Sequence, residues 1–141
     1  NLTKGHFIAP KDIKHQAKKA FDSGNPNVLV TERGATFGYN NLVVDMRGFA
    51  QMREAGLVTC FDATHSVQLP SSGDGETGGD RKFVGLLARS AAAAGIDALF
   101  TEVHENPDAA LCDGPCSLTF ELFEETLRDV LAIRRALGHQ P

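Results

Sequence analysis

The sequence predicts an α/β fold, and the architecture that fits best is a (β/α)8 TIM barrel of which these 141 residues form one half. Short apolar runs alternate with helical patterns four times along the chain. A charged residue closes each strand, and the intervals from Lys4 to Arg33 and from Arg33 to Asp62 are both 29 positions, close to one βα unit. A whole barrel usually takes about 250 residues, so the other half should precede Asn1.

Four short apolar runs are expected to form the strands, and they are Asn1–Lys4, Val28–Thr31, Leu57–Phe61 and Ala98–Phe100. Such runs are typical of parallel strands that are buried on both faces. Glu32 and Arg33 form a charge pair after the second strand, and Asp62 and Glu102 end the third and fourth. In a barrel these residues gather at the carboxyl face, where active sites lie.

Four helical patterns follow these strands, at Lys11–Phe21, Asp45–Ala55, Lys82–Ala94 and Ser117–Leu137. In the first, apolar residues recur at helical spacing with lysines on the opposite face, and the segment SGNP stops it. Gly56 and Gly95 close the second and third helices. Ser117 should cap the last helix, with Glu121 close behind, and Gly138 should end it.

The loops after the strands are long, which also indicates a site at that end. Gly34–Asn41 leads into the second helix, and Pro70–Asp80 contains SSGDGETGGD. Its glycines make Pro70–Asp80 a candidate lid, although a merely disordered loop fits the composition equally well. A doubly wound sheet is the alternative architecture, but the chain has no GxGxxG turn to open a first helix.

Composition excludes several classes of function. The net charge of −4 and the pI of about 5.7 argue against a nucleic-acid partner, which usually requires a basic stripe. The sequence has no apolar run of membrane-spanning length and no apolar signal segment, so no membrane association is expected. The three cysteines have no framework spacing and are expected to be reduced thiols in the cytosol.

Two sets of charged residues suggest chemistry. Lys4 and Arg33 place two cations on one face, where a guanidinium fork and an ammonium would bind a small anionic substrate; a surface ion pair is the alternative for each. His65, Glu102 and Asp113 supply one nitrogen and two carboxylates from neighbouring strand ends. That set suits a divalent cation with an open position, or an acid and base around a water, although spacings of 37 and 11 match no compact metal motif.

Long segments of the chain resemble the 3-deoxy-D-manno-octulosonate 8-phosphate synthases, and they occur in that family's order. The segments are NLTKGHF, TERGATFGYNNLVVDMRG, FDATHSVQLP, TGGDRKF and EVHENPDAALCDGP. The resemblance implies strands five to eight of a (β/α)8 barrel, in a cytoplasmic homotetramer. It also implies the condensation of phosphoenolpyruvate with arabinose 5-phosphate, with release of phosphate, on the route to lipopolysaccharide.

The resemblance assigns roles to individual residues. Lys4 and Arg33 correspond to the cations that bind phosphoenolpyruvate, and Asn40 and Gln68 complete the expected substrate-binding set. We expect His65, Glu102 and Asp113 to position the attacking water and shuttle protons. Two departures from the usual pattern, His6 and Cys116, affect only the detail of substrate contact.

The same three residues, His65, Glu102 and Asp113, match three of the four metal ligands in the metal-dependent members. The fourth ligand, a first-strand Cys, would lie outside this chain, and metal-independent members have Asn there. The segment CDGP, Cys112–Pro115, resembles the metal-independent class. We therefore expect that no metal or cofactor is required, the alternative being a divalent ion such as Mn, Fe or Zn.

Two rival functions remain. A related heptulosonate 7-phosphate synthase would use erythrose 4-phosphate, but the long matches FGYNNLVVDM and DATHSVQLP disfavour it. A non-catalytic anion-binding fragment is the second rival, because half a barrel leaves two open sheet edges.

Overall fold

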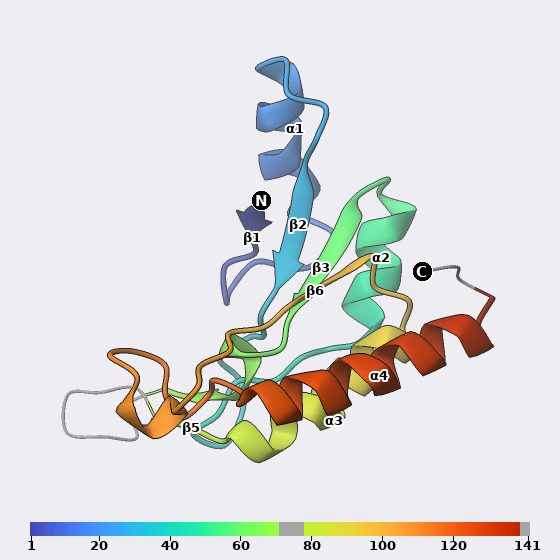
Figure 1. Ribbon diagram of the computed structural model, residues 1–141. Coiled ribbons are helices and arrows are strands. Elements are labelled where there is room, and N and C mark those ends of the chain that lie inside the picture. The colour runs from blue at the N-terminus through green and yellow to red at the C-terminus, as the bar shows by residue number, and fades with distance from the viewer. Residues whose placement is uncertain (71–77, 139–141) are drawn as a thin grey trace.

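The computed structural model describes residues 1–70 and 78–138, which form an α/β fold around a parallel sheet (Figure 1). The four strands of this sheet are β1 (Leu2–Thr3), β2 (Leu29–Glu32), β3 (Val58–Asp62) and β6 (Ala98–Phe100). Their order in the sheet is β1-β2-β3-β6, and every neighbouring pair is parallel. Each strand therefore lies beside the next strand of the sheet along the chain, as expected of consecutive βα units.

Four α-helices alternate with these strands, and they are α1 (Lys14–Asp22), α2 (Arg47–Glu54), α3 (Val84–Ala93) and α4 (Phe120–Ala136). Helices α3 and α4 lie side by side beneath the sheet in Figure 1. The predicted alternation of strands and helices is confirmed. The helices begin and end within a few residues of the predicted positions. Helix α3 starts at Val84 because Arg81–Phe83 first form a 3-10 turn, η2.

The core lies between the sheet and the helices. Phe61 of β3 meets Phe49 of α2 edge to face, with ring centroids 5.9 Å apart, and both rings are fully buried. The small residues Ala88 and Ala92 let α3 approach the same core, to which Val130 of α4 also belongs. Burying these side chains fixes the helices on the sheet, and thereby fixes the strand ends that carry the charged residues.

Two residues of the predicted loop Pro70–Asp80, Gly78 and Gly79, form a short strand. Gln68–Leu69 (β4) pairs antiparallel with Gly78–Gly79 (β5). The lid prediction falls largely on residues 71–77, which lie outside the described part of the chain. Two further 3-10 turns were not predicted: η1 (His65–Val67) follows β3, and η3 (Pro107–Ala109) follows β6.

The capping prediction for the last helix was wrong by two residues. The N-cap of α4 is Thr119, whose hydroxyl accepts a hydrogen bond from the Leu122 backbone N–H at 3.3 Å. Ser117 is buried, and its hydroxyl donates to the Asp113 carbonyl at 3.0 Å. Ser117 therefore stabilises the preceding turn and leaves the cap to the next hydroxyl residue.

Burial along the strands is less uniform than predicted. Val30 and Phe61 of the inner strands are fully buried, but Phe100 of β6 is exposed. The strand β6 lies at an edge of the described sheet, so one side of it has no covering strand. None of the described helices is both long enough and apolar enough to cross a membrane.

Candidate active site

Charged side chains converge at the carboxyl ends of β3 and β6. Asp62 is the last residue of β3, and His65 opens the η1 turn three residues later. Glu102 lies two residues beyond the end of β6, and Asp113 lies in the loop after η3. The parallel sheet brings these ends together although they are far apart in the sequence.

Asp62 orients the His65 ring. Its Oδ2 lies 2.7 Å from His65 Nδ1, and its Oδ1 accepts the His65 backbone N–H at 2.9 Å. The ring also stacks on Phe100, with centroids 5.9 Å apart. The hydrogen bond to the buried Asp62 carboxylate raises the pKa of His65, outweighing the effect of burial. With Nδ1 engaged, Nε2 is the nitrogen that faces the rest of the site.

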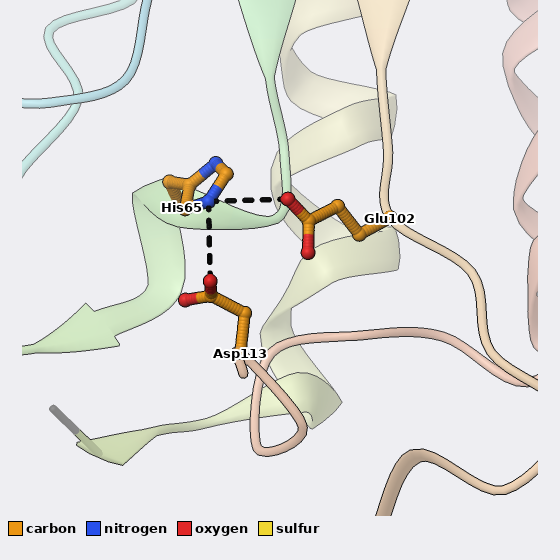
Figure 2. Close-up of side chains that lie close together, drawn as sticks. All are labelled: His65, Glu102 and Asp113. Atoms are coloured by element: carbon orange, nitrogen blue, oxygen red, sulfur yellow. Dashed lines mark ion pairs between the residues drawn. The ribbon is translucent and has the colours of Figure 1, made fainter. Parts of the chain in front are cut away.

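Glu102 and Asp113 approach that Nε2 from two sides (Figure 2). Glu102 Oε1 lies 3.4 Å from His65 Nε2, and Asp113 Oδ2 lies 3.8 Å from it. One ligand atom from each of the three side chains lies within 4.8 Å of the other two. The sequence-predicted set is therefore brought together, and one nitrogen with two carboxylates suits either a divalent cation or a water held between acid and base.

A tight turn presents the Asp113 carboxylate. Asp113 has a φ of 51°, in the left-handed region, and its carbonyl accepts from the Cys116 and Ser117 backbone N–H groups. A Cβ at Gly114 would clash with the Pro107 carbonyl, so only glycine fits there. Backbone strain of this kind is typical of functional sites and requires support from the surrounding structure.

A hydrogen-bonded chain links Arg33 to this cluster. Arg33 Nη2 donates to Gln68 Oε1 at 2.6 Å, and Gln68 Nε2 donates to Asp113 Oδ1 at 2.8 Å. Arg33 Nε is buried and has no hydrogen-bond partner within the described chain. Gln68 and Asp113 also line a cavity of about 580 Å³ with the loop of residues 107–115, a volume that suits a small organic ligand.

Lys4 lies on the neighbouring strand end and has a different set of partners. Its side chain is 3% exposed, and Nζ lies 3.3 Å from Glu32 Oε2. The ammonium also donates to the Gly5 and Ile8 carbonyls, both at 3.1 Å. Glu32 therefore pairs with Lys4 and does not form the expected charge pair with Arg33.

Asn40, like Lys4, has no hydrogen bond or ion pair to the other expected site residues among those described. It lies exposed in the loop after β2, with a φ of 54°. Among the described residues, none is hydrogen-bonded or ion-paired with it.

Two site residues were missed by sequence reasoning. Asp62 was recognised only as a strand end, yet it lies three residues before His65, and the turn between them brings its carboxylate to the His65 ring. Glu32 carried a weaker signal, because its partner Lys4 lies 28 positions away on the adjacent strand. Parallel pairing of Thr3 with Thr31 is what brings these two side chains to one level.

The three cysteines stand outside the His65 cluster. Burial raises the pKa of the Cys116 thiol to about 11 and also raises the pKa of Cys60. Cys112 is exposed beside Asp113. The described metal-ligating set therefore consists of nitrogen and oxygen donors without a thiolate.

Comparisons with known proteins show the family to which this chain belongs. The sequence model of the DAHP synthetase I family matches residues 1–135. The 2-dehydro-3-deoxyphosphooctonate aldolase of Desulfatibacillum aliphaticivorans is 56% identical over 136 residues, which cover 96% of this chain and 50% of that protein. The protein of the same name from Desulfosudis oleivorans is 55% identical over 141 residues, which cover 99% of this chain and 50% of that protein.

A solved structure has the same fold as this chain. The Thermotoga maritima phospho-2-dehydro-3-deoxyheptonate aldolase (DAHP synthase) matches with a TM-score of 0.85 and 31% identity, over 99% of this chain and 38% of that one.

The chain spans about half the length of the curated relatives it matches. The resemblance to the 3-deoxy-D-manno-octulosonate 8-phosphate synthases, for which 2-dehydro-3-deoxyphosphooctonate aldolase is another name, is confirmed by relatives at 52–56% identity. Because the family model covers nearly the whole chain, this protein belongs to the DAHP synthetase I family.

Proposed function

We propose that residues 1–141 form strands five to eight of a (β/α)8 barrel that condenses phosphoenolpyruvate with arabinose 5-phosphate. The products are 3-deoxy-D-manno-octulosonate 8-phosphate and phosphate, in lipopolysaccharide biosynthesis. The observation that carries this proposal is the connection of Arg33, through Gln68, to the His65, Glu102 and Asp113 cluster. An anion-binding group thus adjoins groups that move protons, at the carboxyl end of a parallel sheet.

The cations would hold phosphoenolpyruvate. Arg33 offers a planar fork that suits a carboxylate or a phosphate, and its buried Nε has no hydrogen-bond partner among the described residues. The Lys4 ammonium is fixed by Glu32 and two carbonyls, so it would act as a positioned point charge. Their contribution is to orient the substrate and neutralise its charge before reaction.

The cluster would serve the bond-forming step. C3 of phosphoenolpyruvate attacks the aldehyde carbon of the pentose, a water adds at C2, and the phosphate leaves with its bridging oxygen. His65, Glu102 and Asp113 would position that water and transfer its protons, with Asp62 holding the His65 ring. His65 with its raised pKa is suited to carry a proton near neutral pH.

Catalysis is expected to need no metal. Tight selection of a transition metal is helped by a soft thiolate, which the described cluster lacks, and the Cys112–Pro115 segment resembles the metal-independent class. His65, Glu102 and Asp113 are nevertheless the residues that would hold a divalent cation, which would supply charge stabilisation to the reacting oxygens.

A heptulosonate 7-phosphate synthase is the second candidate, because the Thermotoga maritima structure carries that name. Its 31% identity is well below the 52–56% of the octulosonate relatives, which favours arabinose 5-phosphate as the acceptor. The decisive experiment compares the two aldoses in the complete enzyme that carries this chain. Phosphate release from phosphoenolpyruvate should be fast with arabinose 5-phosphate and slow with erythrose 4-phosphate, and the reverse ranking would overturn the proposal.

The remaining expectations follow the resemblance. We expect a cytoplasmic homotetramer whose partners are the two substrates and copies of itself, without nucleic acid or membrane. Native mass spectrometry tests the assembly and the non-catalytic rival together. A subunit about twice the mass of these 141 residues supports a complete barrel, and a subunit of 15.1 kDa supports the non-catalytic fragment.

A further inference from the structure

We infer that Thr64 is a positioning residue that holds Glu102 in place, and its effect on catalysis rests on the proposed function. Thr64 is 0% exposed and lies between the carboxyl ends of β3 and β6. Its Oγ1 accepts the Glu102 backbone N–H at 2.6 Å. A buried hydroxyl therefore contacts the main chain of a residue whose side chain belongs to the site.

The hydrogen bond replaces a strand partner that Glu102 lacks. The ladder between β3 and β6 ends at Asp62 and Phe100, and the Ala63 N–H still reaches the Phe100 carbonyl at 3.0 Å. Glu102 lies beyond that ladder. Its carbonyl accepts from the Leu118 N–H at 2.9 Å, while its N–H depends on Thr64. Both the N–H and the carbonyl of Glu102 are thus hydrogen-bonded, and the N–H has a single side chain, that of Thr64, as its partner.

The Thr64 hydroxyl does not cap the turn that it begins. Thr64 is the N-cap of the η1 turn, where a threonine usually accepts a backbone N–H of its own turn. It makes no such bond here. Asp62 Oδ1 instead accepts the His65 N–H, which leaves the Thr64 hydroxyl for Glu102.

This arrangement sets the spacing between two site residues. Thr64 precedes His65 in the chain, and it binds the backbone of Glu102, whose Oε1 lies 3.4 Å from His65 Nε2. His65 and Glu102 are therefore both attached to one buried residue, His65 through the chain and Glu102 through a hydrogen bond. Site geometry must hold within about 0.5 Å to be productive, so loss of this bond should misplace the Glu102 carboxylate.

The chain offers a matched control at the opposite end of the same two strands. Thr59 is also 0% exposed, and its hydroxyl donates to Asp97 Oδ2 at 3.0 Å near the amino ends of β3 and β6. Thr59→Val and Thr64→Val remove the same group from equally buried positions. A merely structural role predicts similar effects, whereas a positioning role predicts that only Thr64→Val affects the site.

The experiment combines amide hydrogen exchange with steady-state kinetics in the complete enzyme. In Thr64→Val the Glu102 N–H should lose protection, and kcat should fall about 10- to 100-fold while KM for phosphoenolpyruvate changes less than about twofold. Thr59→Val should leave both readouts unchanged, and Thr64→Ser should restore them. Should Thr64→Val fail to fold, Thr64→Cys, a weaker acceptor, takes its place with the same expectation.

Each outcome decides one question. Unchanged protection of the Glu102 N–H in Thr64→Val overturns the inference. If the wild-type enzyme is active, equal kcat values for Thr64→Val and Thr59→Val overturn it as well. An inactive wild-type enzyme contradicts the proposed function instead, and Glu102 exchange then decides the inference alone.

Discussion

Replacing Asp62 by Asn tests how far the His65 ring depends on its buried partner. Asp62 accepts two hydrogen bonds from His65, one from Nδ1 at 2.7 Å and one from the backbone N–H at 2.9 Å. An Asn side chain has only one acceptor oxygen, and its amide would face one of these donors with another donor. Asp62→Asn therefore keeps the volume of the side chain but loses one contact and the negative charge.

The size of the effect follows from these contacts. A hydrogen bond between charged partners contributes about 1.5–3 kcal/mol, and about 1.4 kcal/mol corresponds to a tenfold change in rate. We expect kcat to fall about 10- to 100-fold, with little change in KM for phosphoenolpyruvate, because Arg33 and Lys4 do not contact Asp62. Steady-state phosphate release measures both constants. The matched control is Asp97→Asn, a carboxylate bonded to Thr59 at the opposite end of β3.

The same variant has a signature in pH. The folded-state pKa of His65 is raised above 6.5, so the charge on His65 beside Asp62 adds stability that is fully present below pH 6.5 and is lost as pH rises through the raised value. Asp62→Asn should therefore lower the melting temperature more in acid than in alkali. A kcat within about twofold of wild type, with a loss of melting temperature independent of pH, would refute this account of His65.

Three further predictions concern the anion site, the metal and the strand β5. Arg33→Ala should weaken the binding of phosphoenolpyruvate by about 1.5–3 kcal/mol and raise its KM accordingly. The control Arg128→Ala, whose side chain is 72% exposed, should match wild type. Equal kinetics for both variants would show that Arg33 is not part of the site. Treatment of the complete enzyme with a strong chelator should leave activity intact, and loss that manganese, iron or zinc restores would make His65, Glu102 and Asp113 metal ligands. Gly79→Ala should cost about 1–3 kcal/mol of unfolding free energy, because its Cβ would overlap Cys116 Sγ; an unchanged melting temperature would contradict the packing of β5.

The central sheet and the His65 cluster could both be predicted from the sequence. Each strand of the sheet is an apolar run closed by a charged residue, and parallel pairing of β3 with β6 brings His65 and Glu102 together across a spacing of 37 positions. The convergence of these two residues follows from topology, which depends on the repeated pattern and not on any local motif. Asp113 joins them through the turn after η3, which depends on local backbone contacts.

Local details were harder to predict because they depend on backbone contacts. Gly78–Gly79 has no side chains that favour a strand, so only its hydrogen bonding with Gln68–Leu69 makes it one. The choice of Thr119 over Ser117 as the cap depends on the Asp113 turn, which engages the serine first. A sequence shows both hydroxyls but not which one the neighbouring turn uses.

The partner of Glu32 illustrates a different limit. Consecutive residues of a strand point to opposite faces, so Glu32 and Arg33 could not face each other while the strand continued. Glu32 instead reaches Lys4 on the adjacent strand and also accepts the Gly34 N–H at 2.6 Å. Strand geometry excludes the local pair, but the actual partner becomes visible only with the register of β1 on β2.

The most direct test of the proposed site is a crystal structure of the complete enzyme with phosphoenolpyruvate bound. The geometry predicts that the ligand contacts the Arg33 guanidinium and lies beside His65, Glu102 and Asp113 at the carboxyl ends of β2, β3 and β6. Phosphoenolpyruvate bound at another surface, with Arg33 still engaged only by Gln68, would contradict the account.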